Sequence, residues 1–229
     1  MNNSGFEKTI AYTFKNKELL TKALTHSSYC REHAVDIRGN NERLEFLGDA
    51  FFDAVISVEL YRRLENVDEG KLTKTRALIV CEKSLATVGT RLNIGEHLNM
   101  GKGEEHSGGR QRESIIADAL EAVIGAIYLD GGYDEAARFV SREFASTIDD
   151  ALAGKLFADY KTQVQEALQK RGQKTFISYK LDREEGPDHD KTFYVHLVCN
   201  GKTLGSGSGK SKKEAEQNAA RATLEGGIK

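Results

Sequence analysis

The sequence has few of the residues that mark a secreted or membrane-bound protein. Its three cysteines, Cys30, Cys81 and Cys199, are odd in number and far apart, which argues against both a disulfide framework and a zinc site. The first residues contain no basic segment followed by an apolar run, and no uncharged stretch approaches the length of a membrane span. We therefore expect a cytoplasmic protein without a membrane partner.

The sequence also lacks the basic excess that most nucleic-acid-binding domains carry, because its net charge is −2 at pH 7. The average hides an asymmetry. Residues 159–229 contain 13 Lys and Arg against 10 Asp and Glu, whereas residues 1–158 contain 20 against 25. An acidic front and a basic rear predict a metal-binding catalytic domain joined to a phosphate-binding one. The length of 229 residues is enough for two domains.

The sequence contains several acids at helical spacing. Residues 41–50, NERLEFLGDA, open a predicted helix in which three acids lie three and four residues apart and so share one face. They are Glu42, Glu45 and Asp49. A different face is apolar, so the acidic stripe borders a core and a cation should occupy it. Mg²⁺ suits such a site because it takes oxygen ligands from a few carboxylates and keeps several waters.

A second acidic pair, Asp118 and Glu121, lies in a strongly apolar helical run over residues 115–124. The spacing of three places both carboxylates on one face. For one such pair alone, a solvated helix surface is the simpler interpretation. Two such clusters in apolar helices favour a metal site instead, because burying several unpaired carboxylates is costly. We expect the two helices to face each other and to share a metal ion.

Four segments resemble the signature regions of bacterial ribonuclease III. They are THSSY (residues 25–29), NERLEFLGDA (41–50), GKGEEHSGGRQRES (101–114) and ADALEAVIGAIYLDGG (117–132). The resemblance continues into the last third and covers nearly the whole chain. It implies an endoribonuclease that cleaves double-stranded RNA by Mg²⁺-dependent hydrolysis, leaves 5′-phosphate and 3′-hydroxyl ends, and processes structured precursors such as rRNA and some mRNAs.

The same resemblance implies roles for the acids. Glu45, Asp49, Asp118 and Glu121 would hold Mg²⁺, with Mn²⁺ as a substitute and without an organic cofactor. Within this set, Asp49 and Glu121 would be tied most directly to catalysis. The attacking group would be a metal-activated water.

Two further acids, Glu42 and Glu69, match catalytic acids of the resembled family. Ion pairs at a dimer interface or contact with substrate are alternatives for both. His26 is left out of the site, because a histidine at a helix end more often makes a structural hydrogen bond.

Double-stranded RNA has two strands, and one compact acidic site cuts only one of them. The resemblance therefore implies a homodimer in which paired sites cleave opposite strands. Phe46 matches the aromatic residue that inserts into the partner subunit. The alternative is that Phe46 belongs to the core of its own chain.

Helical periodicity over residues 5–154 predicts an all-α domain, which the resemblance identifies as the endonuclease domain. The expected helices cover residues 15–26, 41–64, 71–92, 115–130 and 133–152. The glycine-rich stretch 100–110 is typical of a mobile loop. Residues 155–158 are weakly patterned and are the expected linker.

Residues 159–228 show a different pattern. A helix over 161–171 precedes strands at 177–181, 193–199 and 202–204, with the hairpin signal Asn200-Gly201 between the last two strands. A capping box at Ser211 opens a last helix. The order α-β-β-β-α resembles a double-stranded-RNA-binding domain. The sequence thus predicts a multidomain protein, an all-α domain followed by an α+β one.

Three regions of this second domain are expected to contact RNA, the first two because the resemblance implies it. They are Thr162, Gln165, Glu166 and Gln169 on the first helix, Pro187 and His189 in the loop between the first two strands, and Lys210, Lys212 and Lys213 at the start of the last helix. The N-terminus of a helix attracts a phosphate, and the three lysines would bind that phosphate. The glycines within residues 205–209 let the backbone approach a neighbour closely. Contacts of this kind read the shape of A-form RNA more than its sequence.

Two other functions compete with this interpretation. One is a non-catalytic regulator that binds double-stranded RNA and uses its acidic domain only to dimerise. The other is a helical metal phosphohydrolase for small phosphates. The complete set of acids disfavours the first, and the attached α-β-β-β-α domain disfavours the second.

Overall fold

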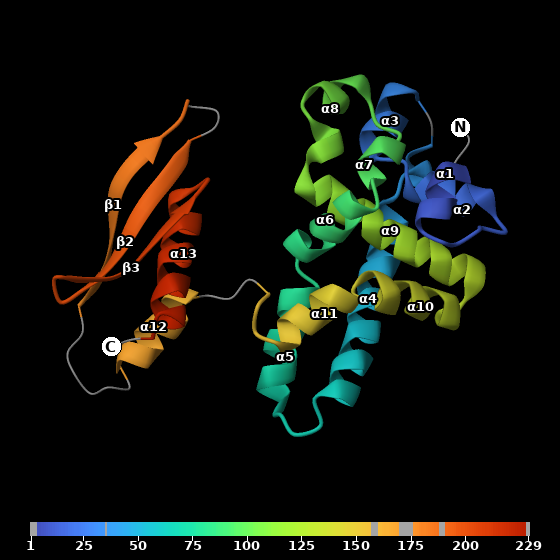
Figure 1. Ribbon diagram of the computed structural model, residues 1–229. Coiled ribbons are helices and arrows are strands. Elements are labelled where there is room, and N and C mark those ends of the chain that lie inside the picture. Colours follow the sequence, from blue (N-terminus) through green and yellow to red (C-terminus); the bar gives the residue numbers. More distant parts are fainter. Residues whose placement is uncertain (1–3, 35, 157–159, 170–175, 188–190, 228–229) are drawn as a thin grey trace. The chain divides into compact units, whose positions relative to one another are not determined.

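The computed structural model describes residues 4–34, 36–156, 160–169, 176–187 and 191–227. The chain divides into two compact units, residues 1–156 and 157–229 (Figure 1). The described part of the first unit is helical, and that of the second has the order α-β-β-β-α. The predicted fold class, an all-α domain followed by an α+β one, is therefore confirmed. None of the described helices is both long enough and apolar enough to cross a bilayer.

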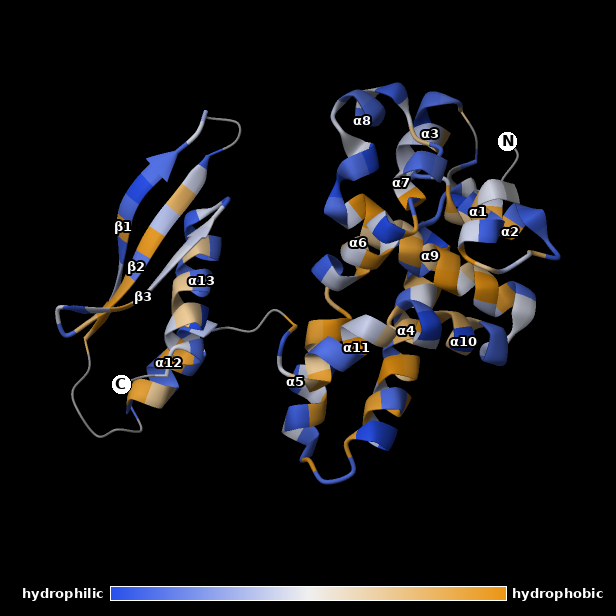
Figure 2. Cartoon of the chain, viewed as in Figure 1, coloured by the Kyte–Doolittle hydropathy of each residue, from blue (hydrophilic) through white to orange (hydrophobic). Residues whose placement is uncertain are grey.

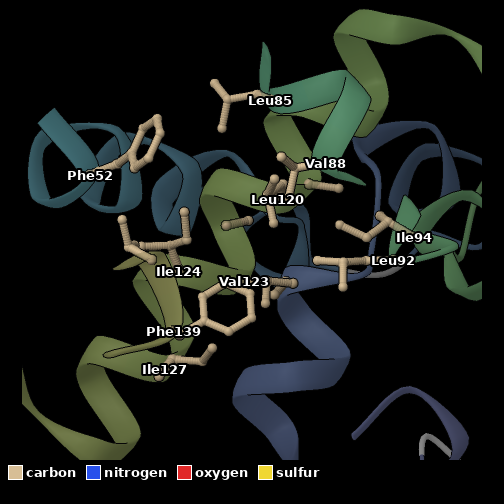
Figure 3. Packing of buried hydrophobic residues seen from close by; sticks show 14 of the residues in the cluster. Phe52, Leu85, Val88, Leu92, Ile94, Leu120, Val123, Ile124, Ile127 and Phe139 are labelled. Atoms are coloured by element: carbon tan, nitrogen blue, oxygen red, sulfur yellow. The ribbon is translucent and has the colours of Figure 1, made fainter. Parts of the chain in front are cut away.

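The first unit is organised around helix α9 (Glu113–Gly131), in which eleven of 19 residues are buried. Residues on neighbouring helices, among them Phe52, Val88 and Phe139, pack around Leu120 and Val123 (Figure 3). The other helices are α1 (Ser4–Thr9), α2 (Lys17–Ala23), α3 (Ser27–Glu32), η1 (Ile37–Gly39), α4 (Glu42–Arg63), α5 (Glu69–Ile79), α6 (Glu82–Arg91), α7 (Ile94–His97), α8 (Lys102–His106), η2 (Gly109–Gln111), α10 (Tyr133–Glu143) and α11 (Ala145–Leu152). Figure 2 shows apolar residues along most of α9, as expected for a helix enclosed by others.

Two of the predicted helices are each divided in the structure. Residues 71–92 form α5 and α6, because Cys81 is extended (φ −71°, ψ 154°) and the Ser84 hydroxyl bonds the Leu78 carbonyl oxygen at 2.9 Å. Residues 133–152 form α10 and α11, which meet at the fully buried Phe144. In both cases the chain turns so that two apolar faces reach one core.

The glycine-rich stretch predicted as a loop is also more ordered than expected. It contains α8 and the short η2. The Arg110 guanidinium donates from Nη1 to the carbonyl oxygens of Gly95 (2.8 Å) and Leu98 (3.0 Å). These bonds tie the stretch to the preceding helix.

The second unit contains a three-stranded antiparallel sheet in the order β1-β2-β3. Its elements are α12 (Tyr160–Gln169), β1 (Ile177–Glu185), β2 (Thr192–Cys199), β3 (Lys202–Gly209) and α13 (Lys212–Glu225). Asn200 (φ 48°) and Gly201 (φ 83°) form the predicted hairpin turn between β2 and β3. The two helices and β2 enclose a separate small core that includes Val164, Leu197 and Ala219.

The glycines of β3 lie against α13. A β-carbon at Gly205 would lie 2.2 Å from the Thr223 hydroxyl oxygen, and one at Gly207 would lie 2.2 Å from the Ala219 nitrogen. The close backbone approach predicted for residues 205–209 is therefore an approach of the strand to its own helix.

Candidate functional site

Helices α4 and α9 touch through two glycines. A β-carbon on Gly48 would lie 1.8 Å from the Glu121 carbonyl oxygen, and one on Gly125 would lie 2.3 Å from the Leu44 carbonyl oxygen. Any larger residue would force the helices apart. Because Gly48 precedes Asp49 and Gly125 lies one turn after Glu121, this contact sets the distance between the acids of the two helices.

Three of the predicted metal ligands meet at this crossing. Carboxylate oxygens of Glu45, Asp118 and Glu121 all lie within 4.8 Å of one another, and the three side chains are half-buried. Asp49 is more exposed, but it is near enough for its charge to raise the pKa of Glu121. A set of clustered carboxylate oxygens matches the preference of Mg²⁺ for hard oxygen ligands. The residues present therefore fit a divalent cation.

The electrostatics of the cluster also favour a bound divalent cation. Burial, followed by the charges of Asp49, Glu45 and Asp118, raises the pKa of Glu121 to about 8. Burial also raises the pKa of Asp118, with a contribution from Glu82, and the pKa of Glu45, with contributions from Asp118 and Glu42. With a pKa of about 8, Glu121 stays mostly protonated at neutral pH unless a positive charge favours its ionised form. A bound divalent cation would supply that charge.

The structure places the other predicted catalytic acids differently. Glu42, the first residue of α4, is exposed at the edge of the cluster and contributes to the raised pKa of Glu45. Glu69 opens α5, is exposed, and lies 3.4 Å from the Thr73 hydroxyl. Within one chain, the three-carboxylate cluster found among the described residues does not include Glu69.

Two acids near the cluster were not predicted from the sequence. Asp53 lies one turn beyond Asp49, its charge raises the pKa of Glu121, and its own Oδ1 is buried without a hydrogen bond to the described residues. The spacing of four from Asp49 continues the acidic stripe, so the sequence did contain a signal for it. Glu82 is close enough to raise the pKa of Asp118. It belongs to α6, and only the fold brings it there.

His26 makes the structural hydrogen bonds expected of it. It caps α3, where its Nδ1 accepts from the Ser28 backbone nitrogen at 3.3 Å. The Ser28 hydroxyl in turn accepts from the Gly101 backbone nitrogen at 2.9 Å. His26 thus caps α3, and Ser28 joins that helix to the segment that begins α8.

Phe46 is not a core residue of this chain, because 79% of its side chain is exposed. It lies at a groove of about 600 Å³ whose lining includes Leu19, Leu47 and Leu129. An exposed phenylalanine next to an apolar groove is a feature of protein interfaces.

The second unit gathers several of the predicted RNA-binding residues on one surface. Thr162, Gln165, Gln169 and Lys213 line a shared hollow of about 540 Å³. Glu166, Pro187, Lys210 and Lys212 are exposed, and His189 lies outside the described residues. Polar groups from two helices thus face the same space.

Two family models match the chain. The model described as Ribonuclease-III-like matches residues 16–148, and the double-stranded RNA binding motif matches residues 160–226. Ribonuclease 3 of Pelotomaculum thermopropionicum is 49% identical over 215 residues, which cover 94% of this chain and 89% of that relative. Ribonuclease 3 of Clostridium perfringens is 48% identical over 219 residues, which cover 96% and 91%.

Solved structures of ribonuclease III nuclease domains are similar to this chain. The nuclease domain of ribonuclease III from Campylobacter jejuni is 42% identical, with a TM-score of 0.59 over 64% of this chain and 97% of that chain. A second structure of that domain, with a TM-score of 0.58, is described as flexible in a region involved in dimer formation. The helices that carry the acidic cluster, α4 and α9, lie within residues 16–148, which the Ribonuclease-III-like model matches.

Proposed function

The chain belongs to the ribonuclease III family of double-stranded-RNA-specific endoribonucleases, and we propose that it hydrolyses RNA phosphodiesters at an Mg²⁺ site formed by Glu45, Asp49, Asp118 and Glu121. The observation that carries the proposal is the convergence of acids from α4 and α9, with oxygens of Glu45, Asp118 and Glu121 within 4.8 Å of one another. Half-buried carboxylates at this distance repel one another when they are ionised, and a bound cation would offset that repulsion.

In this proposal each acid has a distinct task. Glu45, Asp118 and Glu121 bind the ion, and Asp49, on the exposed side of α4, completes the site toward solvent and substrate. Mg²⁺, or Mn²⁺ in its place, would be held by these acids and would supply the Lewis acidity that polarises a phosphate and favours ionisation of an attacking water. The products carry 5′-phosphate and 3′-hydroxyl ends. Glu42 and Glu69 are exposed and suit contact with substrate or with a partner subunit.

We propose that the active form is a homodimer, in which two acidic sites cut the two strands of the duplex. Phe46 and the apolar groove beside it support this, because both are exposed in one chain and would be buried between two. The three cysteines are free, which fits a reducing compartment. We infer that the protein acts in the cytoplasm on structured precursors such as rRNA and some mRNAs.

The second unit would bind the duplex by its shape. The α12 face with Thr162, Gln165, Glu166 and Gln169 would reach one minor groove, and the loop with Pro187 and His189 would reach another. Lys210, Lys212 and Lys213 would meet the phosphates between them. These three regions match the way that helical RNA, with its shallow minor groove, is recognised.

The direct test is to incubate the protein with long duplex RNA, single-stranded RNA and duplex DNA, each with Mg²⁺ and with chelator. We expect cleavage of duplex RNA alone, and only with the ion. Glu121→Gln is expected to lower the cleavage rate by about 100-fold or more while duplex binding in chelator stays unchanged. Glu113→Gln, an exposed acid at the start of the same helix, is the matched control. Turnover by Glu121→Gln equal to that of the control at saturating Mg²⁺ would refute the site.

A further inference from the structure

We propose that Glu184, an acid inside the basic surface of the second unit, is a positioning residue for RNA binding. Its carboxylate holds the ammonium groups of Lys212 and Lys191 where they meet RNA phosphates. The inference rests on the proposed role of the second unit in binding duplex RNA. It adds to that role a residue of the opposite charge from the one expected in such a surface.

The strand register places Glu184 on the helix-covered face of the sheet. Glu184 pairs with Phe193 of β2, and Phe193 pairs with Gly209 of β3. Gly209 belongs to the face that meets α13, because a β-carbon there would lie 2.7 Å from Glu214 Cγ. Side chains alternate between the two faces of a strand, so Glu184 points to the face from which α13 begins.

At this place Glu184 lies between two lysines from different elements. Its Oε1 is 3.4 Å from Lys212 Nζ on α13, and its Oε2 is 3.6 Å from Lys191 Nζ next to β2. The Glu184 side chain is 33% exposed, against 61% for Lys212. Lys212 Nζ also lies 5.7 Å from the centre of the Phe193 ring. The Glu184 carboxylate and an aromatic ring therefore both lie near the Lys212 ammonium group and limit the orientations of the long side chain.

This arrangement prepares Lys212 for phosphate without using up its capacity. An ammonium group has three donors, so one bond to Glu184 leaves two for an RNA phosphate. A free lysine side chain loses rotamer entropy on binding, and holding it in advance removes part of that loss. Glu184 also offsets the repulsion between two ammonium groups, which would otherwise turn away from each other.

A positioning role for Glu184 predicts the opposite change in RNA affinity from simple charge counting. RNA is a polyanion, so removal of an acid from the binding surface should strengthen binding if only net charge counted. If Glu184 positions the lysines, its removal should weaken binding. Glu185 provides the matched control. It is the next residue in β1, its Oε1 accepts from Arg183 Nε at 2.7 Å, and its replacement by Gln changes the net charge by the same amount.

The experiment measures the affinity of the full chain for a short RNA duplex, in chelator and over a range of salt concentrations. We expect Glu184→Gln to bind about 3- to 10-fold more weakly, with a salt slope smaller by about one because one phosphate contact is lost. Glu185→Gln should bind as tightly as the native protein or slightly more tightly. A merely structural defect would reduce the active fraction and leave the slope unchanged, which would overturn the inference.

Two further variants separate this inference from the proposed function. Lys212→Ala should weaken binding by itself, and adding Glu184→Gln to it should weaken binding less than Glu184→Gln does in the native chain, because only Lys191 is then left for Glu184 to hold. If Lys212→Ala weakens binding but Glu184→Gln does not, the positioning role is wrong and RNA binding by the unit stands. If Lys212→Ala binds like the native protein, the RNA contact itself is wrong. Glu184→Asp keeps the charge and withdraws the carboxylate, so native affinity in this variant would also overturn the inference.

Discussion

Glu121 combines a half-buried carboxyl group with a pKa raised to about 8, mainly by burial and then by the charges of neighbouring acids. An unfolded glutamate loses its proton near the ordinary value of 4.5. Between these two pH values the folded chain binds more protons than the unfolded chain, so its stability falls as pH rises through that window. The carboxylate that the proposed metal needs therefore destabilises the metal-free fold.

The raised pKa of Glu121 predicts how the stability of the metal-free protein changes with pH. At pH 8 in chelator, Glu121→Gln should be more stable than the native chain by about 1–2 kcal/mol, a value that allows for water reaching a half-buried group. At pH 4.5 the difference should vanish. Urea unfolding at both pH values measures it. Glu65→Gln, an exposed acid in the turn after α4, should follow the native curve. A pH profile for Glu121→Gln that also matches the native one would contradict the prediction.

Phe46 allows a second test at the residue scale. Phe46→Ala should shift the protein from dimer toward monomer in analytical ultracentrifugation, with an association constant lower by about 100-fold, as for a buried aromatic anchor. Phe176, which is 81% exposed in the second unit, is the matched control, and Phe176→Ala should leave association unchanged. Equal effects of the two substitutions would show that Phe46 has no special place in the dimer.

Local spacing explains why some site residues could be found from the sequence and others could not. Glu45 with Asp49, and Asp118 with Glu121, share helix faces that follow from spacings of three and four alone. Their meeting across α4 and α9 was inferred from the cost of burying unpaired acids, and Glu45, Asp118 and Glu121 do meet. Glu82 comes near Asp118 only through the packing of α6, for which no local pattern exists.

At the scale of elements, the crossing of α4 and α9 is the feature most open to a test. Gly125→Ala would place a β-carbon 2.3 Å from the Leu44 carbonyl oxygen, so the helices must move apart. We expect a loss of about 1–3 kcal/mol in unfolding free energy, together with weaker binding of Mg²⁺ in calorimetry. Gly103→Ala is the control, because that glycine lies in α8 with no atom within 4 Å of the added carbon. If Gly125→Ala kept the native stability and metal affinity, the crossing of α4 and α9 would accommodate a β-carbon at this position.

The elements that the sequence mispredicted share a physical cause. The apolar periodicity runs on across Cys81 and Phe144, because the helices on both sides of each break bury residues in the same core. Periodicity records burial and not the direction of the axis. The ordered turns within residues 100–110 depend on bonds from Arg110 to the preceding segment. By contrast, Asn200 and Gly201 form their turn from local preferences alone, and that turn was predicted.

For the whole molecule, the two separate cores imply that the units can be tested apart. A fragment ending at Gly154 should remain folded and dimeric and should cut duplex RNA at low salt, since all four proposed ligands lie within it. Its Michaelis constant should rise about 10- to 100-fold at physiological salt, because the tethered second unit no longer concentrates the substrate at the site and screening weakens the remaining attraction. Cleavage assays over a salt series measure this. A folded, dimeric fragment that is inert under all salt and Mg²⁺ conditions would mean that the second unit takes part in catalysis.

The glycine contact between α4 and α9 also has a consequence for the lifetime of the chain in a cell. Because the two backbones touch, the acids of the two helices are held close together, and their repulsion must be offset by protonation or by a bound cation. A chain without its ion opens more often, and opened chains are what proteases degrade. We therefore expect the amount of enzyme to follow the magnesium supply. Starvation for the ion would then lower both the activity of each molecule and the number of molecules that survive.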